Sequence, residues 1–309
     1  MTRRSAVLIG FAVPVSGAWA TPANQVLIAQ RAEELGYHSL WTLQRLVNPA
    51  DTADHTYRNV SDPLITLAYL AGYTSRVRLG VAIVNVPFTS PPLLAKQAAT
   101  LDHVTGGRLD LGLGLGWMPA EFAATGVPME RRGARAEEFV AALRSLWADE
   151  VSEFHGEFYD IPPVLFDPKP LQSPEPPILM GGSSEPALRR AGRLAAGWVS
   201  SSRADLAGIG RSIEIVRESA EKAGRDPAAL RFVCRGAVRV RPAGAPGRRP
   251  LTGSHEEIRS DFGVLAEQGV TELFVDVNFD PELTGPDADP WDSMYLAREA
   301  LDAFAPPRL

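Results

Sequence analysis

The chain has 309 residues, of which 45% are hydrophobic and 22% charged, a composition typical of a globular protein with an ample core. Its formal net charge of −6 argues against a nucleic-acid partner, because a phosphate backbone attracts a basic surface. The single cysteine, Cys234, excludes an internal disulfide and any CxxC motif. No apolar run reaches the roughly 18 residues of a membrane span, so we expect neither a nucleic acid nor a membrane as partner.

The first apolar run, residues 6–12, has two interpretations. Arg3 and Arg4 precede it and Ala18-Trp19-Ala20 follows it, which imitates a secretory signal with its cleavage site. The run is short, however, and Gly10 and Pro14 interrupt it. We therefore favour a first buried strand in a cytoplasmic protein.

Beyond this strand, apolar segments with the period of strands alternate with segments that have the period of helices. Strands are expected at 6–12, 39–43, 77–84, within 106–117, and at 177–182, 197–201, 231–240 and 272–278. Helices are expected at 22–35, 62–73, 92–105, 131–148, 185–196, 206–223, 255–268 and 291–304. About eight alternations without a break in composition predict an α/β fold, a single (β/α)₈ TIM barrel spanning residues 1–309, with a doubly wound sheet as the alternative. A small insertion around residues 152–170, rich in aromatic residues and proline, is expected to form a short hairpin or a lid.

The fourth strand has the sequence GGRLDLGLGLGW at residues 106–117. Leucines alternate with Asp110, Gly112, Gly114 and Gly116, so the leucines share one face of the strand and the glycines the other. Glycine weakens a strand because it has no side chain to pack, so a run of glycines indicates that another group approaches the backbone closely. We expect the leucines to pack against helices, and the glycines to leave a flat gap for a planar ligand; an ordinary buried strand is the alternative.

A second glycine pair lies in the segment ILMGGSSE, at residues 178–185. An apolar strand there runs through Gly181 and Gly182 into a helix that begins near Glu185. Backbone amides at a helix N-terminus form a ready anion site, and the hydroxyls of Ser183 and Ser184 can add hydrogen bonds. The alternative is an ordinary strand-to-helix turn with a serine cap, which leaves the two glycines unexplained.

Taken together, several segments of the chain resemble the luciferase-like flavin and deazaflavin oxidoreductases. The resemblance rests on AEELGYHSLW at residues 32–41, on the long segment 76–117, and on residues 130–147, 154–160 and 176–199. It implies a (β/α)₈ barrel, usually a homodimer, that binds FMN or the deazaflavin coenzyme F420 at the C-terminal ends of the strands. The segment 76–117 resembles the F420-dependent subgroup more closely.

The resemblance also implies the cofactor site. The backbone of Gly181, Gly182 and Ser183 would bind the phosphate, with Ser184 beside it, and the strand with Gly114 and Gly116 would lie beside the ring. A non-prolyl cis peptide, at Ala82-Ile83, would press a bulge against the ring face, with Asn85 at the ring edge.

One departure from the family pattern changes the expected chemistry. Many relatives carry an acidic residue and a histidine after the second strand, whereas this chain has Gln44 and Arg45. Arginine stays protonated and cannot act as a general base, but it can stabilise negative charge on a substrate or a reduced cofactor. Gln44 and Arg45 are therefore the catalytic candidates, with a solvated loop charge as the alternative for Arg45.

The remaining candidates are weaker. The five histidines are scattered and show no metal-ligand spacing, so no metal is predicted. Glu121 is a candidate to brace the segment after Trp117, and Trp117 to line a pocket or cap the barrel. The expected function is hydride transfer between F420 and a small-molecule substrate; an FMN-dependent monooxygenase with a partner reductase, or a flavin-binding homologue without catalysis, are the alternatives.

Overall fold

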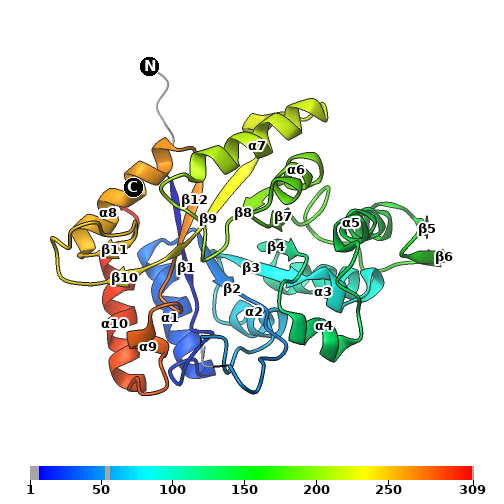
Figure 1. The fold of residues 1–309 in the computed structure, drawn as a ribbon. Helices are drawn as coiled ribbons and strands as arrows, with labels where there is room; N and C mark the ends of the chain where they lie inside the picture. The colour runs from blue at the N-terminus through cyan, green and yellow to red at the C-terminus, as the bar shows by residue number, and fades with distance from the viewer. Residues whose placement is uncertain (1–6, 53–55, 308–309) are drawn as a thin grey trace.

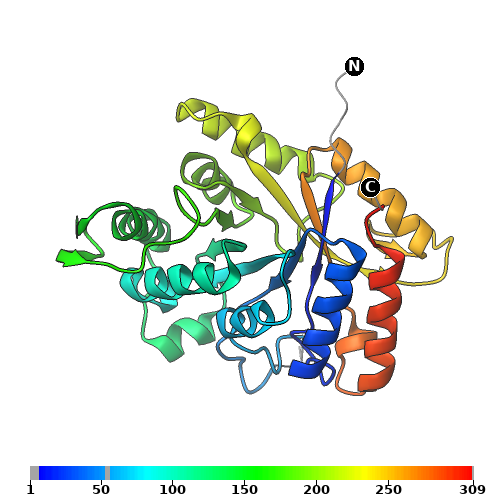
Figure 2. The ribbon, with the colours of Figure 1, turned by 180° about the vertical axis from the view of Figure 1, so that it is seen from behind.

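Figures 1 and 2 show the computed structural model, which describes residues 7–52 and 56–307. Eight parallel strands close into a barrel in the order β1-β12-β9-β8-β7-β4-β3-β2, and helices surround it. The predicted (β/α)₈ barrel is confirmed, and the doubly wound alternative is wrong. The barrel strands are β1 (Leu8–Ala12), β2 (Ser39–Thr42), β3 (Arg78–Asn85), β4 (Leu109–Gly114), β7 (Ile178–Gly181), β8 (Gly197–Val199), β9 (Arg231–Ala237) and β12 (Glu272–Asp276).

The predicted helices are also present, within a few residues of the expected bounds, because most begin at a cap that the sequence shows plainly. Ser, Thr or Asp with proline at the next position opens α1, α2, α3 and α10. The predicted helices are α1 (Pro22–Leu35), α2 (Pro63–Ala71), α3 (Pro91–Thr105), α5 (Arg132–Ala148), α6 (Glu185–Leu194), α7 (Ile209–Lys222), α8 (His255–Glu267) and α10 (Pro290–Ala303). Within the described residues no helix is both long enough and apolar enough to cross a bilayer.

The insertion is an antiparallel hairpin of β5 (Val151–His155) and β6 (Asp160–Leu165), as predicted. The Glu138 carboxylate of α5 accepts hydrogen bonds from the amides of Glu157 and Phe158, at 3.0 and 2.8 Å, and so holds the hairpin turn. Both views place the hairpin beside α5 at the outer edge of the molecule, away from the C-terminal ends of the strands. The lid interpretation is therefore wrong.

Several short elements were not predicted, because each is too brief to show a periodic pattern. They are α4 (Pro119–Thr125), α9 (Pro281–Thr284), the 3₁₀ turns η1 (Val86–Phe88) and η2 (Pro227–Ala229), and a two-stranded sheet of β10 (Arg239–Val240) and β11 (Thr252–Gly253). The predicted seventh strand is therefore divided into β9 and β10. The predictions for Arg3, Arg4 and Ala6 concern positions outside the described residues, and so does the position of His55, one of the five scattered histidines.

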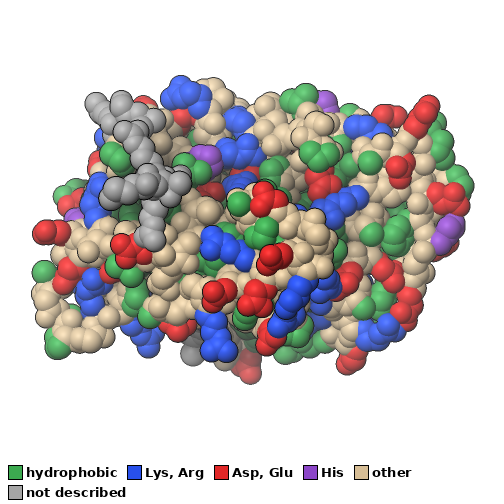
Figure 3. Space-filling model, turned by 90° about the horizontal axis from the view of Figure 1, so that it is seen from above, with side chains coloured by type: hydrophobic (Ala, Val, Ile, Leu, Met, Phe, Trp, Pro, Cys, Tyr) green, Lys and Arg blue, Asp and Glu red, His purple; other side chains and the backbone are tan. Residues whose placement is uncertain are grey.

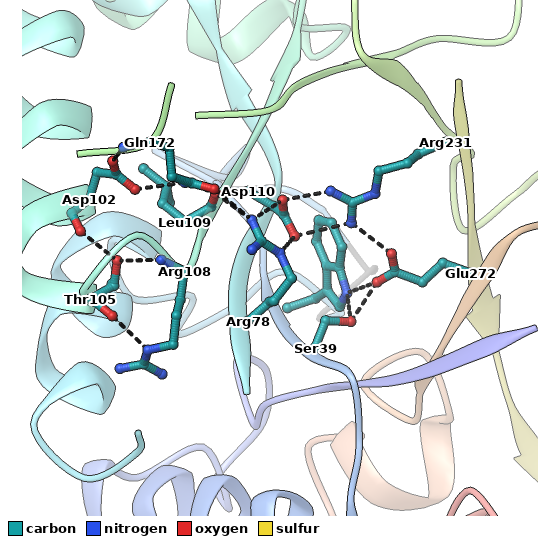
Figure 4. A network of polar contacts seen from close by, with 11 residues as sticks. Ser39, Arg78, Asp102, Thr105, Arg108, Leu109, Asp110, Gln172, Arg231 and Glu272 are labelled. Carbon is teal, nitrogen blue, oxygen red and sulfur yellow. Dashed lines mark hydrogen bonds and ion pairs between the residues drawn. The ribbon is translucent and has the colours of Figure 1, made fainter. Parts of the chain in front are cut away.

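A network of ion pairs closes the barrel at the N-terminal ends of its strands (Figure 4). The buried Asp110 carboxylate accepts hydrogen bonds from Arg78 and Arg231, and Arg231 also pairs with Glu272 at 2.7 Å. The second Glu272 oxygen accepts a hydrogen bond from the Ser39 hydroxyl at 2.5 Å. Figure 3 views the molecule from this end, where acidic and basic side chains are interspersed. The two carboxylates of this network balance its two guanidinium groups, so we assign this end of the barrel a role in the stability of the fold.

We expect Asp110→Asn to lower the free energy of unfolding by roughly 3–5 kcal/mol near pH 7, because it removes one partner of a buried ionic network. Burial alone would raise the pKa of Asp110, but hydrogen bonds from Arg78 and Arg231 outweigh it and hold that pKa below the ordinary value. The stabilisation is therefore complete above the unfolded pKa, near 3.9, and is lost as the pH falls through the lower folded pKa.

Urea unfolding of wild type and variant, near pH 7 and again in acid, measures both effects. Asp302→Asn is the matched control, because Asp302 pairs with Arg31 on the exposed surface and such pairs contribute about 0–1 kcal/mol. Equal losses at the two positions would contradict a structural role for the buried network.

Candidate functional site

The candidate site lies where the barrel strands end. All eight strands are parallel, so their C-terminal ends meet at one face of the barrel, the end at which TIM-barrel enzymes carry their active sites. In Figure 1 this face points downward. We call this face the mouth; the ends of β2, β3, β4 and β7 bring the predicted residues to it.

The centre of the mouth is a bulge in β3. The peptide bond Ala82–Ile83 is cis, as the family resemblance implies, and the register of β3 with β4 shifts between Val81 and Val84. The carbonyl of Ala82 accepts a hydrogen bond from Arg235 Nη1 at 3.2 Å. The bulge therefore turns its backbone toward the barrel axis, where a side chain of β9 fixes it.

The glycine face of β4 is filled by this bulge. A methyl group built at Gly114 would lie 1.8 Å from Cδ1 of Ile83, and one built at Gly112 would lie 3.2 Å from Cγ2 of the same side chain. The expectation of an open gap for a planar ligand is therefore wrong: the glycines make room for Ile83. The leucines of β4 do pack in the outer core with the helices, as predicted.

Gly116, the next glycine of the segment, is also enclosed. It has φ +71°, and a methyl group built there would lie 3.0 to 3.1 Å from the rings of Phe122 and Phe88. Gly114 and Gly116 stay predictions as cofactor contacts, and any such contact with Gly114 has to be shared with Ile83.

Gln44 and Asn85 are brought together. The Gln44 Oε1 atom accepts a hydrogen bond from the backbone amide of Asn85 at 2.8 Å, which ties the segment after β2 to the end of β3. This hydrogen bond therefore fixes the orientation of the Gln44 carboxamide, whose oxygen is already bound to a protein donor.

Arg45 lies in the protein interior, and the interpretation as a solvated loop charge is wrong. Its side chain is only 5% exposed and Nη1 lies 2.5 Å from Oε2 of Glu121, which is 0% exposed. The other oxygen of Glu121 accepts the amide of Leu46 at 2.8 Å. Glu121, contributed by α4, therefore braces Arg45 and the chain that follows it. Arg45 Nε is buried and has no hydrogen-bond partner among the described residues.

Aromatic rings enclose the Arg45 guanidinium. Its central carbon lies 4.4 Å from the ring centroid of Tyr57 and 4.9 Å from that of Trp117, within the range of cation–π attraction. Trp117 is 51% exposed, so it forms part of the rim of the mouth, and the central carbon of the Arg203 guanidinium lies 5.6 Å from its ring centroid.

Arg235 is the second guanidinium held at the mouth. Its Nε atom lies 2.8 Å from a carboxylate oxygen of the buried Asp276, and its central carbon is 4.6 Å from the ring centroid of Phe279. Phe279 also meets Tyr57 edge to face at 5.8 Å. Two ion-paired arginines and three aromatic rings thus form one continuous polar and aromatic wall.

The turn from β7 to α6 has the shape that an anion site requires. Gly182 has φ +131°, and a methyl group built on it would lie 2.6 Å from Cβ of Ala187, so glycine alone fits there. Its carbonyl accepts a hydrogen bond from Trp198 Nε1 at 2.8 Å. Ser184 occupies the N-cap position of α6, but its side chain accepts no capping hydrogen bond. Ser183 and Ser184 are exposed. Pro186 has no N–H, and the Ala187 amide donates to the Ser184 carbonyl at 2.9 Å, so the amides left for an anion at this end of α6 are those of Ser184 and Glu185.

Cys234 and His103 have environments that fit a structural role. Burial raises the pKa of the Cys234 thiol to about 12, although a hydrogen bond with Ser200 opposes this. His103 lies in α3, where its Nε2 is 2.8 Å from the carbonyl oxygen of Lys169, so a structural role fits it. Over residues 7–52 and 56–307, no group of three or more His, Cys, Asp or Glu side chains is placed to hold a metal ion.

Sequence reasoning missed four of the residues that form the wall: Tyr57, Arg235, Asp276 and Phe279. Arg235 lies in the seventh strand, Asp276 is the last residue of the eighth and Phe279 follows it, all beyond the region where the family resemblance is specific. Tyr57 lies in a polar loop. Their position in the chain could have identified some of them, because polar residues near the C-terminal ends of barrel strands are candidates for function.

The chain was compared with known protein families and structures. A family model described as luciferase-like monooxygenase matches residues 4–249. An uncharacterised protein of Mycobacterium tuberculosis is 34% identical over 211 residues, which cover 64% of this chain and 72% of that protein. The FMNH₂-dependent dimethylsulfone monooxygenase of Pseudomonas putida is 36% identical over 210 residues, which cover 67% of this chain and 55% of that enzyme.

Among solved structures, an F420-dependent secondary alcohol dehydrogenase in complex with an F420–acetone adduct superposes with a TM-score of 0.79. It is 18% identical, and the match covers 97% of this chain and 99% of that one, so it shows a shared fold. The family model covers most of the chain, and the barrel is the fold of these structures. The chain therefore belongs to the luciferase-like monooxygenase family, and with it to the oxidoreductases.

Proposed function

We propose that the chain is an F420-dependent oxidoreductase that transfers a hydride between the deazaflavin and a small organic substrate at the mouth of the barrel. The observation that carries the proposal is the glycine cradle at Gly182, with the uncapped amides of α6 beside it. A phosphate-bearing cofactor is the kind of ligand that such a turn accepts. The cradle belongs to β7, which pairs with β4, the strand that packs against the Ile83 bulge.

The residues at the mouth fit a planar, anionic ring system. Arg45 Nε is a buried donor without a partner, and a buried polar group in this state calls for an acceptor from a ligand or water. In this proposal Gly181, Gly182, Ser183 and Ser184 hold the phosphate, and Ala82, Ile83 and Asn85 position the ring. When bound, F420 supplies a two-electron hydride donor or acceptor.

The chain supplies orientation and charge stabilisation. Arg45 remains protonated, so it stabilises negative charge on the reduced cofactor or the substrate and does not act as a base. Glu121 holds the guanidinium in place without any reorganisation during the reaction. Gln44, anchored on Asn85, orients the neighbouring chain, and Tyr57 and Trp117 limit the access of water to Arg45.

A second candidate function is an FMN-dependent monooxygenase that receives reduced flavin from a partner reductase. The observation that favours it is the 36% identity with an FMNH₂-dependent monooxygenase. The third, a flavin-binding homologue without catalysis, rests on the absence of an acid–histidine pair at Gln44 and Arg45.

Side-by-side titration of the purified protein with F420 and FMN distinguishes these functions. Trp117 stands at the rim and Trp41 inside the barrel, so we expect tryptophan fluorescence to be quenched by the ligand that binds. Tight binding of F420, followed by its reduction or oxidation with a substrate, is the expected result. Preference for FMN would favour the monooxygenase, and binding of neither would overturn the proposed function.

We also propose that the protein is a homodimer, with α2 at the interface. The α2 sequence PLITLAYLA contains no charged residue, and it still presents Ile65, Tyr69 and, just past its end, Tyr73 to solvent. The neighbouring α3 adds the exposed side chains of Leu93 and Val104. A helix that is apolar all round is normally covered, and an uncharged patch can pair with its own copy around a two-fold axis. Light scattering before the titration should give twice the 33.3 kDa of one chain; the mass of a single chain would contradict this.

A further inference from the structure

A hollow of about 380 Å³ lies on the outer surface between α5 and α6, apart from the aromatic wall of the mouth. Its lining is almost entirely charged and consists of Glu137, Glu185, Pro186, Arg189, Arg190 and Arg193. Three guanidinium groups face two carboxylates, so the hollow keeps a net positive charge in a chain whose formal net charge is −6.

The arginines of the hollow are held in different ways. Arg190 is 8% exposed, and its Nε atom lies 3.1 Å from the Glu137 carboxylate. A methyl group built at Gly133 would lie 2.5 Å from Arg190 Nη2, so this guanidinium packs directly on the first turn of α5. Arg189 and Arg193 are more exposed and pair with Glu185 and Glu137, at 2.5 and 2.7 Å. Arg190 is thus held rigidly at the base of the hollow, whereas the side chains of Arg189 and Arg193 are exposed enough to change partners.

The adjoining end of α5 carries further donors without a protein acceptor. Arg132 Nη1, next to Gly133 in the chain, is buried and has no hydrogen-bond partner among the described residues. Residue Arg131, at the N-cap of α5, provides no capping side chain, so the amides of this first turn have no protein acceptor within the helix. Donors thus accumulate where the two helices approach each other.

The hollow begins at the residues that follow the glycine cradle in the chain. Glu185 and Pro186, which line it, directly follow Ser184, and Arg189 and Arg193 lie on the same face of α6 at spacings of four residues. An extended anion whose phosphate lies at the start of α6 would meet Arg189 and then Arg193 along the helix. Charge-assisted hydrogen bonds to carboxylates are the interaction that arginine makes best.

We propose that this hollow binds the anionic tail of the cofactor beyond its first phosphate. This inference rests on the proposed F420 dependence. F420 continues from its phosphodiester into a chain of carboxylates, whereas FMN ends at one phosphate. The hollow is then a specificity site: it adds contacts that only the longer anion makes, and Glu185 and Glu137 release Arg189 and Arg193 as the tail carboxylates replace them.

The test compares binding of three probes: F420, the deazaflavin nucleoside that lacks the phosphodiester and glutamates, and FMN. The variant is Arg189→Glu/Arg193→Glu. Its matched control is Arg211→Glu/Lys222→Glu on α7, which changes the net charge equally at exposed positions. We expect the first variant to weaken F420 binding at least about tenfold, with affinity for the nucleoside unchanged, and the control to bind all three probes like wild type.

The outcomes separate the two proposals. Wild-type binding of F420 that persists unchanged in Arg189→Glu/Arg193→Glu would overturn the tail site and leave the proposed function standing. Failure of the wild-type protein to bind F420 would overturn both. Equal weakening of F420 and the nucleoside would show damage to the ring site, and would also overturn the tail site. Unchanged F420 affinity with a raised KM for an anionic substrate would assign the hollow to the substrate instead.

Discussion

Replacement of Gly182 by valine is expected to weaken cofactor binding by about 100-fold or more. At φ +131° a β-branched residue is strained, and its Cβ would come within 2.6 Å of Cβ of Ala187 in the first turn of α6. Either the helix start or the turn has to move, and the amides that would face a phosphate then lose their alignment. The loss of two charge-assisted hydrogen bonds, each contributing roughly 1.5–3 kcal/mol, gives the expected magnitude.

A control for this substitution is a glycine that also has a positive φ but lies away from the turn between β7 and α6. Gly224, after α7, has φ +73°, and a methyl group built on it meets nothing within 4 Å. Gly224→Val is therefore expected to reduce stability without changing cofactor affinity. Affinities for F420 and FMN, measured on both variants at a temperature where each is folded, decide the matter. Wild-type affinity in Gly182→Val would remove the phosphate assignment from the β7–α6 turn.

The barrel itself was predictable because its signals are local and repeated. Periods of two and 3.6 residues alternate eight times, and proline after Ser, Thr or Asp marks where helices begin. The short elements carried no such signal. The sheet of β10 and β11 consists of two residues in each strand, and pairs that small depend on contacts from distant parts of the chain.

The glycine strand shows where periodicity stops being informative. The alternation of leucine and glycine correctly divided β4 into two faces, but could not say what approaches the glycine face. The answer lies some thirty residues earlier in the chain, in the bulge that directs the Ile83 side chain against Gly112 and Gly114. The space beside the glycines of β4 is thus filled by a side chain from the bulge of β3, and only the pairing of the two strands in the structure shows this.

The environment of Arg45 could be predicted only in part. The family pattern singled out its position, and Glu121 was a candidate to brace the chain after Trp117. The pairing of the two across 76 residues depends on α4, a helix of seven residues that periodicity does not show. Arg235 and Asp276 were missed for a related reason, since the resemblance weakens before the strands that carry them.

Substitutions in the Arg45–Glu121 pair can distinguish the effect of the Arg45 charge on the cofactor from its effect on the stability of the fold. Arg45→Met alone leaves the Glu121 carboxylate buried without its partner, so we expect the free energy of unfolding to fall by roughly 3–5 kcal/mol. In Arg45→Met/Glu121→Gln no charge remains, and the Gln oxygen can still accept the amide of Leu46. The double variant is therefore expected to recover most of that stability.

Function should not recover with stability. Both variants lack the guanidinium that would stabilise a reduced, anionic cofactor, so the reduction potential of the bound cofactor is expected to fall by about 30 mV for each tenfold loss of that stabilisation. Turnover should fall with it, by about 100-fold. Arg31→Met, in an exposed pair with Asp302, controls for loss of an arginine elsewhere. A double variant with the wild-type potential and turnover would assign Arg45 a purely structural role. A low potential in a stable double variant would instead show that Arg45 acts on the cofactor, in the place where many relatives carry a histidine.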